Sequence, residues 1–171
     1  MVLRTEDFSH PETQKKNFGP GDAFDFSPFK IAILCSRWYK SIGEALVEGA
    51  QNTLQGAGIP QKNLYKFWAA GSFELPLLAQ QCAELSHIHG LIVLGCVVQG
   101  LTPHFHYISA TVSTALMNIS LQSKKPLGFG LLTVHTQSQA LERSQGKNNK
   151  GKEAAHAVLD SLRTLSNLRD N

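Results

Sequence analysis

Four short apolar runs alternate with longer segments of helical periodicity, and this alternation constrains the fold more than any other feature. One of them, residues 31–36, is continuous, which is typical of a strand that is covered on both faces. The runs cover residues 31–36, 64–69, 91–98 and 127–133. Apolar residues recur at helical spacing in residues 42–57, 75–85, 105–123, 138–144 and 150–168.

Strands that are joined through helices form a parallel sheet with right-handed connections. We therefore expect an α/β fold of the flavodoxin-like kind, a three-layer αβα sandwich whose four-stranded parallel sheet has the order 2-1-3-4. In such sheets a ligand binds at the carboxyl ends of the strands, beside the point where the strand order reverses. The segments after Ser36, Ala69 and Val98 are thus predicted to form the site.

Composition indicates one globular domain, which we place at residues 29–171. A formal net charge of +3 gives no electrostatic argument for nucleic-acid binding. Residues 1–28 are polar and broken by Pro and Gly, so we predict an N-terminal extension that is partly disordered or docks on a neighbour. No membrane-spanning run or signal-peptide pattern is present, and we expect a cytoplasmic protein. Three cysteines without a C-x-x-C motif are expected to be buried thiols.

Each segment at the predicted site carries a side chain that suits a ligand. Trp38 offers an aromatic face to a planar ring, or it covers the core or an interface. Glu74 lies near a helix N-terminus, where it binds hydroxyl groups or acts as a capping acid. His104 opens the long helix after Gly100, a position from which an imidazole moves protons near neutral pH. A capping or core histidine is the alternative.

Other polar residues give weaker patterns. The pairs His104 with His106 and His87 with His89 lack further ligands at zinc-like spacing, so we expect no metal site. Arg143 is the candidate phosphate ligand, because a guanidinium binds phosphate in bidentate fashion, although periodicity alone favours a surface arginine. No dinucleotide or P-loop glycine motif occurs, which disfavours nucleotide binding.

Five motifs, in order and on the elements above, resemble those of the 6,7-dimethyl-8-ribityllumazine synthase family. The likeness extends from about residue 29 to the C-terminus. Each motif is weak alone, but five in sequence at near-family spacing are specific. The motifs read R-W at 37–38, G-S-F-E-L-P at 71–76, G-C-V-V-Q-G-L-T-P-H at 95–104, P-L-G-F-G at 126–130, and L-E-R at 141–143 with N-K-G at 149–151.

The resemblance implies a transferase of riboflavin biosynthesis. The reaction would condense 5-amino-6-(D-ribitylamino)uracil with 3,4-dihydroxy-2-butanone 4-phosphate, releasing phosphate and water. The family needs no metal and no organic cofactor. It also assembles as a homo-oligomer, either a pentamer or a sixty-subunit shell. Riboflavin synthase is a candidate partner, whereas neither nucleic acid nor a membrane is expected.

The same resemblance implies a role for each matching residue. His104 would move protons and Arg143 would bind phosphate, as the catalytic pair. Trp38 would stack on the pyrimidine, and Phe129 and Arg143 would come from the neighbouring subunit. The other substrate-binding residues would be Gly71, Ser72, Phe73, Glu74, Val97, Val98, Gly100, Leu101, Thr102, Phe129 and Lys150.

Four residues differ from the family's usual pattern near the site. They are Ala70, Gln99, His106 and His135, where the family commonly has Pro, Arg, an acidic residue and Asp. The alternative hypothesis is a lumazine- or riboflavin-binding or storage protein with little turnover. A structural shell with a vestigial site is a third.

Overall fold

Four parallel strands form one sheet in the order β2-β1-β3-β4, as predicted. The computed structural model describes residues 24–169. The strands are β1 (Ile31–Ser36), β2 (Leu64–Ala69), β3 (Gly90–Val98) and β4 (Leu127–Val134). The helices are α1 (Lys40–Gly56), α2 (Leu75–Glu84), α3 (His104–Ser123), α4 (Gln137–Ser144) and α5 (Lys150–Arg169), with 3-10 turns η1 (Gln61–Asn63) and η2 (Gly146–Asn148).

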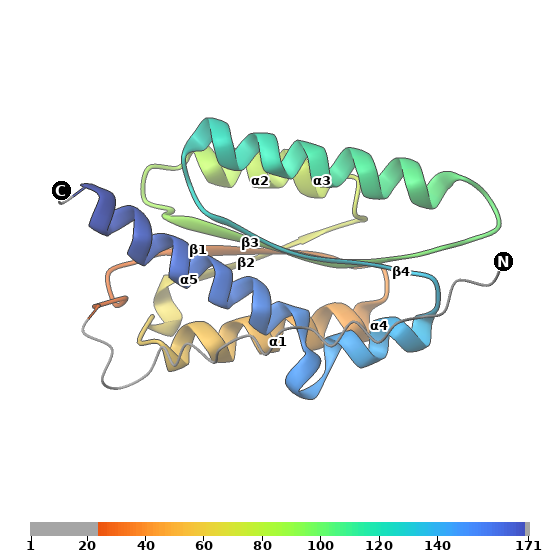
Figure 1. Cartoon of the computed structure of the whole chain (residues 1–171), viewed down its shortest axis with the longest axis horizontal. Coiled ribbons are helices and arrows are strands. Elements are labelled where there is room, and N and C mark those ends of the chain that lie inside the picture. Colours follow the sequence, from red (N-terminus) through yellow and green to blue (C-terminus); the bar gives the residue numbers. More distant parts are fainter. Residues whose placement is uncertain (1–23, 170–171) are drawn as a thin grey trace, which may run out of the picture.

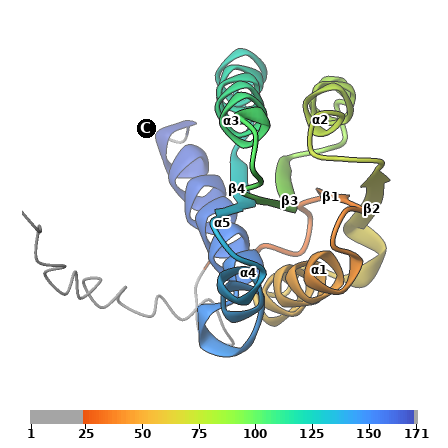
Figure 2. The same ribbon diagram turned by 90° about the vertical axis from the view of Figure 1, so that its right-hand side faces the viewer.

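Helices cover both faces of the sheet. Figure 2 shows α2 and α3 on one face and α1, α4 and α5 on the other. Strand β1 explains why both faces are apolar: Ile31, Ile33 and Cys35 pack in one core, while Ala32 and Leu34 pack in the other. Successive side chains of a strand point to opposite faces, so a continuous apolar run supplies both cores. The predicted three-layer sandwich is confirmed.

Boundary differences between prediction and structure are small and have a common cause. Helix α1 begins at Lys40, two residues before the first apolar residue of its pattern, and α3 begins at His104 rather than at residue 105. The periodic pattern marks the buried face, whereas the hydrogen-bonded helix starts earlier. The N-cap of α4 is Thr136, which forms a reciprocal capping box with Gln139.

The carboxyl edge of the sheet is stepped. Strand β1 is aligned with β3 as far as Cys35 opposite Leu94, and it ends one residue later. Strands β3 and β4 continue together to Val98 opposite Val134. Three residues of β3 therefore extend beyond the level of Ser36, a rise of about 10 Å at roughly 3.3 Å per residue. Figure 1 shows the β3–α3 connection reaching farther than the β1–α1 connection.

The amino edge of the sheet is closed by aromatic packing. Phe26 is 2% exposed, and its ring meets that of Phe24 at 4.7 Å between centroids. The backbone N–H of Lys30 donates to Nδ1 of His89 at 2.9 Å. Most of the predicted extension, residues 1–23, lies outside the described residues, and the domain boundary near residue 28 stays a prediction.

All three cysteines are buried, as predicted. Burial, with the charge of Glu44 as a smaller cause, raises the pKa of Cys35 to about 12, and burial raises the pKa of Cys96 to about 11. Both thiols therefore stay protonated near neutral pH. Among residues 24–169, no helix has the length and apolar character needed to cross a membrane.

Candidate active site at the carboxyl edge of the sheet

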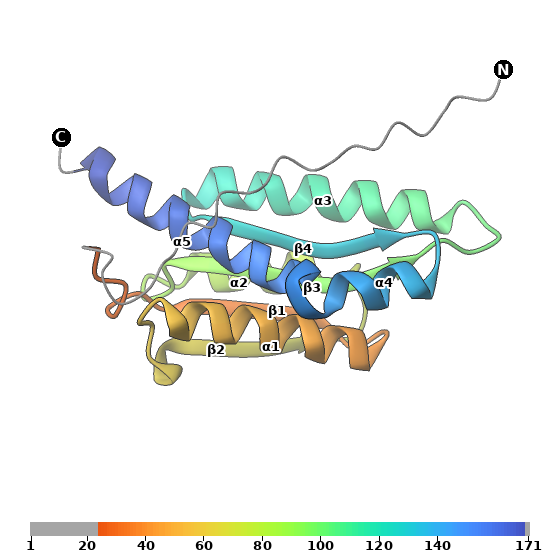
Figure 3. The ribbon, with the colours of Figure 1, turned by 60° about the horizontal axis from the view of Figure 1, so that its bottom comes forward.

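Because the carboxyl edge is stepped, the candidate site has a floor at the ends of β1 and β2 and a wall at the longer ends of β3 and β4. The segments after β1 and β2 begin at the lower level, because Ser36 pairs with Ala69. The last residues of β3 stand above that level, and Val97 and Val98 there are half-buried. Figure 3 shows the ends of β3 and β4 beside the starts of α4 and α3. The predicted segments after Ser36, Ala69 and Val98 therefore meet at one edge.

Trp38 presents its indole ring to solvent at the lower level. The backbone N–H of Arg37 donates to the carbonyl of Ala69 at 2.9 Å, which ties the segment to the end of β2. Tyr39 then takes a left-handed conformation, with φ of 59°, before α1 starts. Trp38 is 68% exposed. It is not a core residue of this chain, and its ring is accessible to a planar ligand.

The segment after β2 carries a carboxylate that makes no capping bond. Glu74 occupies the N-cap position of α2, but its side chain forms no cap hydrogen bond there. Its Oε2 lies over Gly71, 3.0 Å from where a Cβ on that glycine would be. Ser72 is buried, whereas the Phe73 ring is 61% exposed. Glu74 therefore makes no capping hydrogen bond, although it still lies at the helix N-terminus, and its carboxylate can accept hydrogen bonds from a ligand.

The segment after β3 leads to an open helix N-terminus. Pro103 is the N-cap of α3, with no side-chain cap bond and no acidic residue in the first turn. The first N–H groups of such a helix attract an anion. Gly100, Leu101 and Thr102 are exposed just before this turn, and so is His104, its first residue. The arrangement places an imidazole beside an anion-binding helix end.

Arg143 and Lys150 lie on the opposite layer of the sandwich. Arg143 lies in the last turn of α4, where its Nη1 donates to the carbonyl of Gln139 at 3.3 Å and lies 3.9 Å from Glu142. Lys150 begins α5 and pairs with Glu153 at 2.7 Å. Helices α4 and α5 cover one face of the sheet, and α3 with His104 covers the other (Figure 2). Within one chain, the structure does not bring these cations to His104.

The turn between α4 and α5 is anchored by Asn149, whose role the sequence motif alone did not reveal. Asn149 is 4% exposed, and its Nδ2 donates to the carbonyls of Ala45 at 2.9 Å and Ser144 at 2.5 Å. Its Oδ1 accepts from the N–H of Lys152 at 3.1 Å. A Cβ on Gly151 would collide with the carbonyl oxygen of Leu46. The N-K-G motif thus fixes this turn against α1.

Phe129 lies away from the carboxyl edge of its own chain. It faces Val93 in the register and precedes Val134, the end of β4, by five residues. At roughly 3.3 Å per residue this is about 16 Å along the strand. The side chain is 47% exposed, on the edge strand of the sheet. Its ring is therefore available to another molecule rather than to the site of its own subunit.

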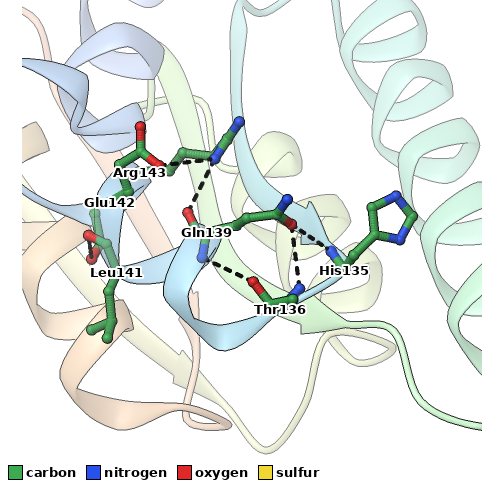
Figure 4. A network of polar contacts seen from close by, with 7 residues as sticks. His135, Thr136, Gln139, Leu141, Glu142 and Arg143 are labelled. Carbon is green, nitrogen blue, oxygen red and sulfur yellow. Dashed lines mark hydrogen bonds and ion pairs between the residues drawn. The ribbon is translucent and has the colours of Figure 1, made fainter. Parts of the chain in front are cut away.

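A polar cluster at the end of β4 also borders the site. His135 Nδ1 is hydrogen-bonded to Oε1 of Gln99, and the ring of His135 lies against that of Phe105. Figure 4 shows His135, Thr136 and Gln139 joined by hydrogen bonds, with Arg143 linked through Gln139. From the sequence, Gln99 and His135 are two separate departures from the family pattern, and their contact was not predicted. Their strand-end positions in neighbouring strands were the signal that could have done so.

A doubly wound parallel sheet with an exposed indole, carboxylate and imidazole at its carboxyl edge defines an α/β enzyme of flavodoxin-like fold. Residues 28–166 match the model of the 6,7-dimethyl-8-ribityllumazine synthase family. The chain belongs to this family, which confirms the family predicted from the motifs.

Three relatives illustrate the match. The 6,7-dimethyl-8-ribityllumazine synthase of Nitratidesulfovibrio vulgaris is 40% identical over 146 residues, covering 85% of this chain and 94% of the relative. The 6,7-dimethyl-8-ribityllumazine synthase 1 of Caulobacter vibrioides is 40% identical over 145 residues, covering 84% and 95%. The synthase of Blochmanniella pennsylvanica is 41% identical over 144 residues, covering 83% and 91%.

Proposed function

We propose that this chain catalyses the condensation of 5-amino-6-(D-ribitylamino)uracil with 3,4-dihydroxy-2-butanone 4-phosphate to form 6,7-dimethyl-8-ribityllumazine, with release of phosphate and water. One observation carries the proposal. Trp38, Glu74 and His104 are all exposed, on the segments that follow β1, β2 and β3 at the stepped carboxyl edge of a chain of this family. The relatives bear the name of that synthase, and the match with this chain covers nearly their whole length.

The lower level of the site suits the uracil substrate. Trp38 stacks on the pyrimidine ring, because its indole is exposed at the end of β1. The Glu74 carboxylate binds ribityl hydroxyls, since no capping bond occupies it. Backbone groups of residues 71–73 complete the hydrogen bonds, and Val97 with Val98 forms the apolar wall beside the ring.

The start of α3 suits the phosphate of the second substrate. Gly100, Leu101 and Thr102 present backbone and hydroxyl donors, and the open N-terminus of α3 adds favourable electrostatics. His104 moves protons while the amino group of the uracil forms an imine with the ketone and while phosphate leaves. Holding both substrates in one orientation can itself lower the barrier by roughly 7–11 kcal/mol.

The remaining residues reach the site from a neighbouring subunit. Phe129, Arg143 and Lys150 lie away from the carboxyl-edge site of their own chain but remain partly or fully accessible. In a homo-oligomer, Phe129 would close the ring pocket and the two cations would bind phosphate. We propose a homopentamer, alone or within a sixty-subunit shell, as its form.

An apolar stripe on α3 supports assembly. Tyr107, Met117 and Leu121 are 71%, 61% and 67% exposed on this helix, and Leu77 on neighbouring α2 is 69% exposed. Helical spacing of about 100° per residue puts the three α3 side chains on one side. Exposed apolar patches of this kind mark protein–protein contacts. Sedimentation analysis should give about five times the 18.7 kDa of the chain, or a multiple of it.

Mixing two inactive variants tests the shared site directly. His104→Ala and Arg143→Ala chains are each expected to lose lumazine formation, followed by absorbance and fluorescence. In mixed rings, a site that takes His104 from one chain and Arg143 from the next is intact in about a quarter of cases, so activity should return to that fraction. Recovery would not occur if both residues served the same chain's site. Failure of the unmodified chain to form any lumazine would refute the proposed reaction.

A flavin- or lumazine-binding protein is the second candidate, because the exposed Trp38 ring would stack on a flavin equally well. Tight riboflavin binding without turnover would favour it, whereas turnover that depends on His104 removes both this candidate and the vestigial shell. The cytoplasmic location and the riboflavin synthase partner stay predictions.

A further inference from the structure

His135 contacts both ends of the segment that carries His104. The segment runs from Gln99, directly after β3, to Phe105 in the first turn of α3. Oε1 of Gln99 is an amide oxygen and only accepts, so Nδ1 of His135 donates to it. The rings of His135 and Phe105 are stacked, with centroids 6.4 Å apart and planes 29° apart. One imidazole therefore joins the start of the segment to its end.

Burial does little to hold the residues between these two contacts. Residues 100–104 are all exposed, and Leu101 shows its whole side chain to solvent. At the start of the segment, the N–H of Gln99 also donates to the carbonyl of Val134 at 2.9 Å. A segment with few buried contacts opens easily, unless its ends are fixed. The position of His104 therefore depends on how firmly Gln99 and Phe105 are held.

The backbone of His135 is held by hydrogen bonds to the first turn of α4. Its backbone N–H donates to Oε1 of Gln139 at 2.9 Å, and the N–H of Thr136 donates to the same oxygen at 3.3 Å. The N–H of Gln139 in turn donates to Oγ1 of Thr136 at 3.3 Å, which completes the capping box (Figure 4). The end of β4 and the start of α4 are thus joined by hydrogen bonds at the residue that carries the imidazole ring.

We infer that His135 is a positioning residue, which holds residues 99–105 so that the donors of residues 100–102 and the imidazole of His104 face the substrate. It acts through Gln99 and Phe105 and not on the reacting atoms. The catalytic part of this inference rests on the proposed function, whereas the contacts that carry it belong to the structure alone.

Kinetics of His135→Ala separate positioning from a general loss of folded protein. The KM for the phosphate substrate should rise about fivefold, the effect of losing one neutral hydrogen bond, and kcat should fall. The KM for the ribitylaminouracil should stay unchanged, because Trp38 and Glu74 lie on other segments. Less folded protein would lower the maximal rate and leave both KM values unchanged.

Two further variants test the proposed path. His135→Asn keeps a donor at the position of Nδ1 but loses the ring contact with Phe105, so it should restore most of the KM for the phosphate substrate. Gln99→Ala should reproduce most of the effect of His135→Ala, because it removes the hydrogen bond but leaves the ring contact with Phe105, and the double variant should be no worse than His135→Ala alone. Additive losses, or no rescue by asparagine, would overturn the inference. Because Gln99 is exposed, its variant also serves if His135→Ala does not fold.

Amide hydrogen exchange keeps this test independent of the proposed reaction. The amide of Gln99, whose N–H donates to the carbonyl of Val134, should exchange several-fold faster in His135→Ala than in the unmodified chain, in the absence of substrate. His87→Ala is the matched control, since His87 is also exposed and its ring also lies against an aromatic ring, that of Tyr65 at 5.8 Å. Unchanged exchange in His135→Ala refutes the positioning role, whereas an inactive unmodified chain refutes only the reaction.

Discussion

At the carboxyl end of the sheet Trp38, Phe73 and Leu101 are more than half exposed, whereas at the amino end Phe26 and Ile88 are almost fully buried. Side chains of similar apolar character thus serve different purposes at the two ends. At the amino end they fill the core and stabilise the fold. At the carboxyl end they stay accessible to a substrate or a neighbouring subunit. Substitutions at the carboxyl end should therefore alter activity, whereas substitutions at the amino end should alter stability.

His104→Ala should give the largest effect and bears on the carboxyl end alone. Loss of a group that transfers protons is expected to lower kcat about 10²- to 10⁴-fold. The free energy of unfolding should change little, because His104 is exposed. Steady-state kinetics and thermal unfolding at one fixed protein concentration would measure the two quantities. His87→Ala is the control, and a comparable loss of activity there would break the comparison.

Phe26→Ala addresses the amino end with the opposite expectation. Removal of a ring that is 2% exposed should lower the free energy of unfolding by about 3–5 kcal/mol, because it leaves a cavity among Phe24 and Phe29. Denaturant unfolding would measure this loss. The KM values of the protein that remains folded should not change. A shift in either KM would show that the two ends are coupled.

Trp38→Ala should have a smaller effect, confined to one substrate. The KM for the ribitylaminouracil is expected to rise about tenfold, since a stacked aromatic pair is worth up to roughly 1.5 kcal/mol beyond the area it buries. The KM for the phosphate substrate should be unaffected. Trp38→Phe keeps an aromatic face and should recover most of the loss. Equal effects of the two substitutions would contradict stacking.

His89→Asn should give the smallest change and sharpens the comparison through pH. Burial, and then the charges of Lys125, Lys30 and His87, lower the pKa of His89 below its ordinary 6.5. A histidine with a lowered pKa in the folded state contributes full stability above pH 6.5, and that stability is lost as the pH falls below this value, because the unfolded chain takes up the proton more readily. Asparagine keeps an acceptor for the N–H of Lys30 without titrating. Unfolding between neutral and acidic pH should therefore be less pH-dependent in His89→Asn, and an unaltered profile would exclude His89 as a cause.

The sheet was predictable because each strand is a short, largely apolar run with a helical segment behind it. Residues 31–36 and 64–69 became β1 and β2 without any change of boundary. The parallel arrangement then required the segments after Ser36, Ala69 and Val98 to meet at one edge. This part of the candidate site follows from topology and from local chemistry.

Contacts between side chains of different elements were not predictable in the same way. The link between Gln99 and His135 depends on the register of β3 and β4, which the chain pattern does not specify to one residue. The buried Asn149 bonds to Ala45, which is 104 positions away in the chain. That Phe129 and Arg143 lie away from the site of their own subunit was implied by the family resemblance alone, because it depends on three-dimensional packing.

The unequal strand lengths described above also govern how the site could change. Its depth is set by backbone pairing and not by side-chain size, so it varies in increments of two residues. Removing one residue from the end of β3 would turn the side chains beyond that point to the other face. Removing two from both β3 and β4 would keep the alternation and lower the wall by about 6–7 Å. A redesigned or diverging member could therefore admit a bulkier heterocycle by paired shortening of these two strands, leaving the floor with Trp38 and Glu74 as it stands.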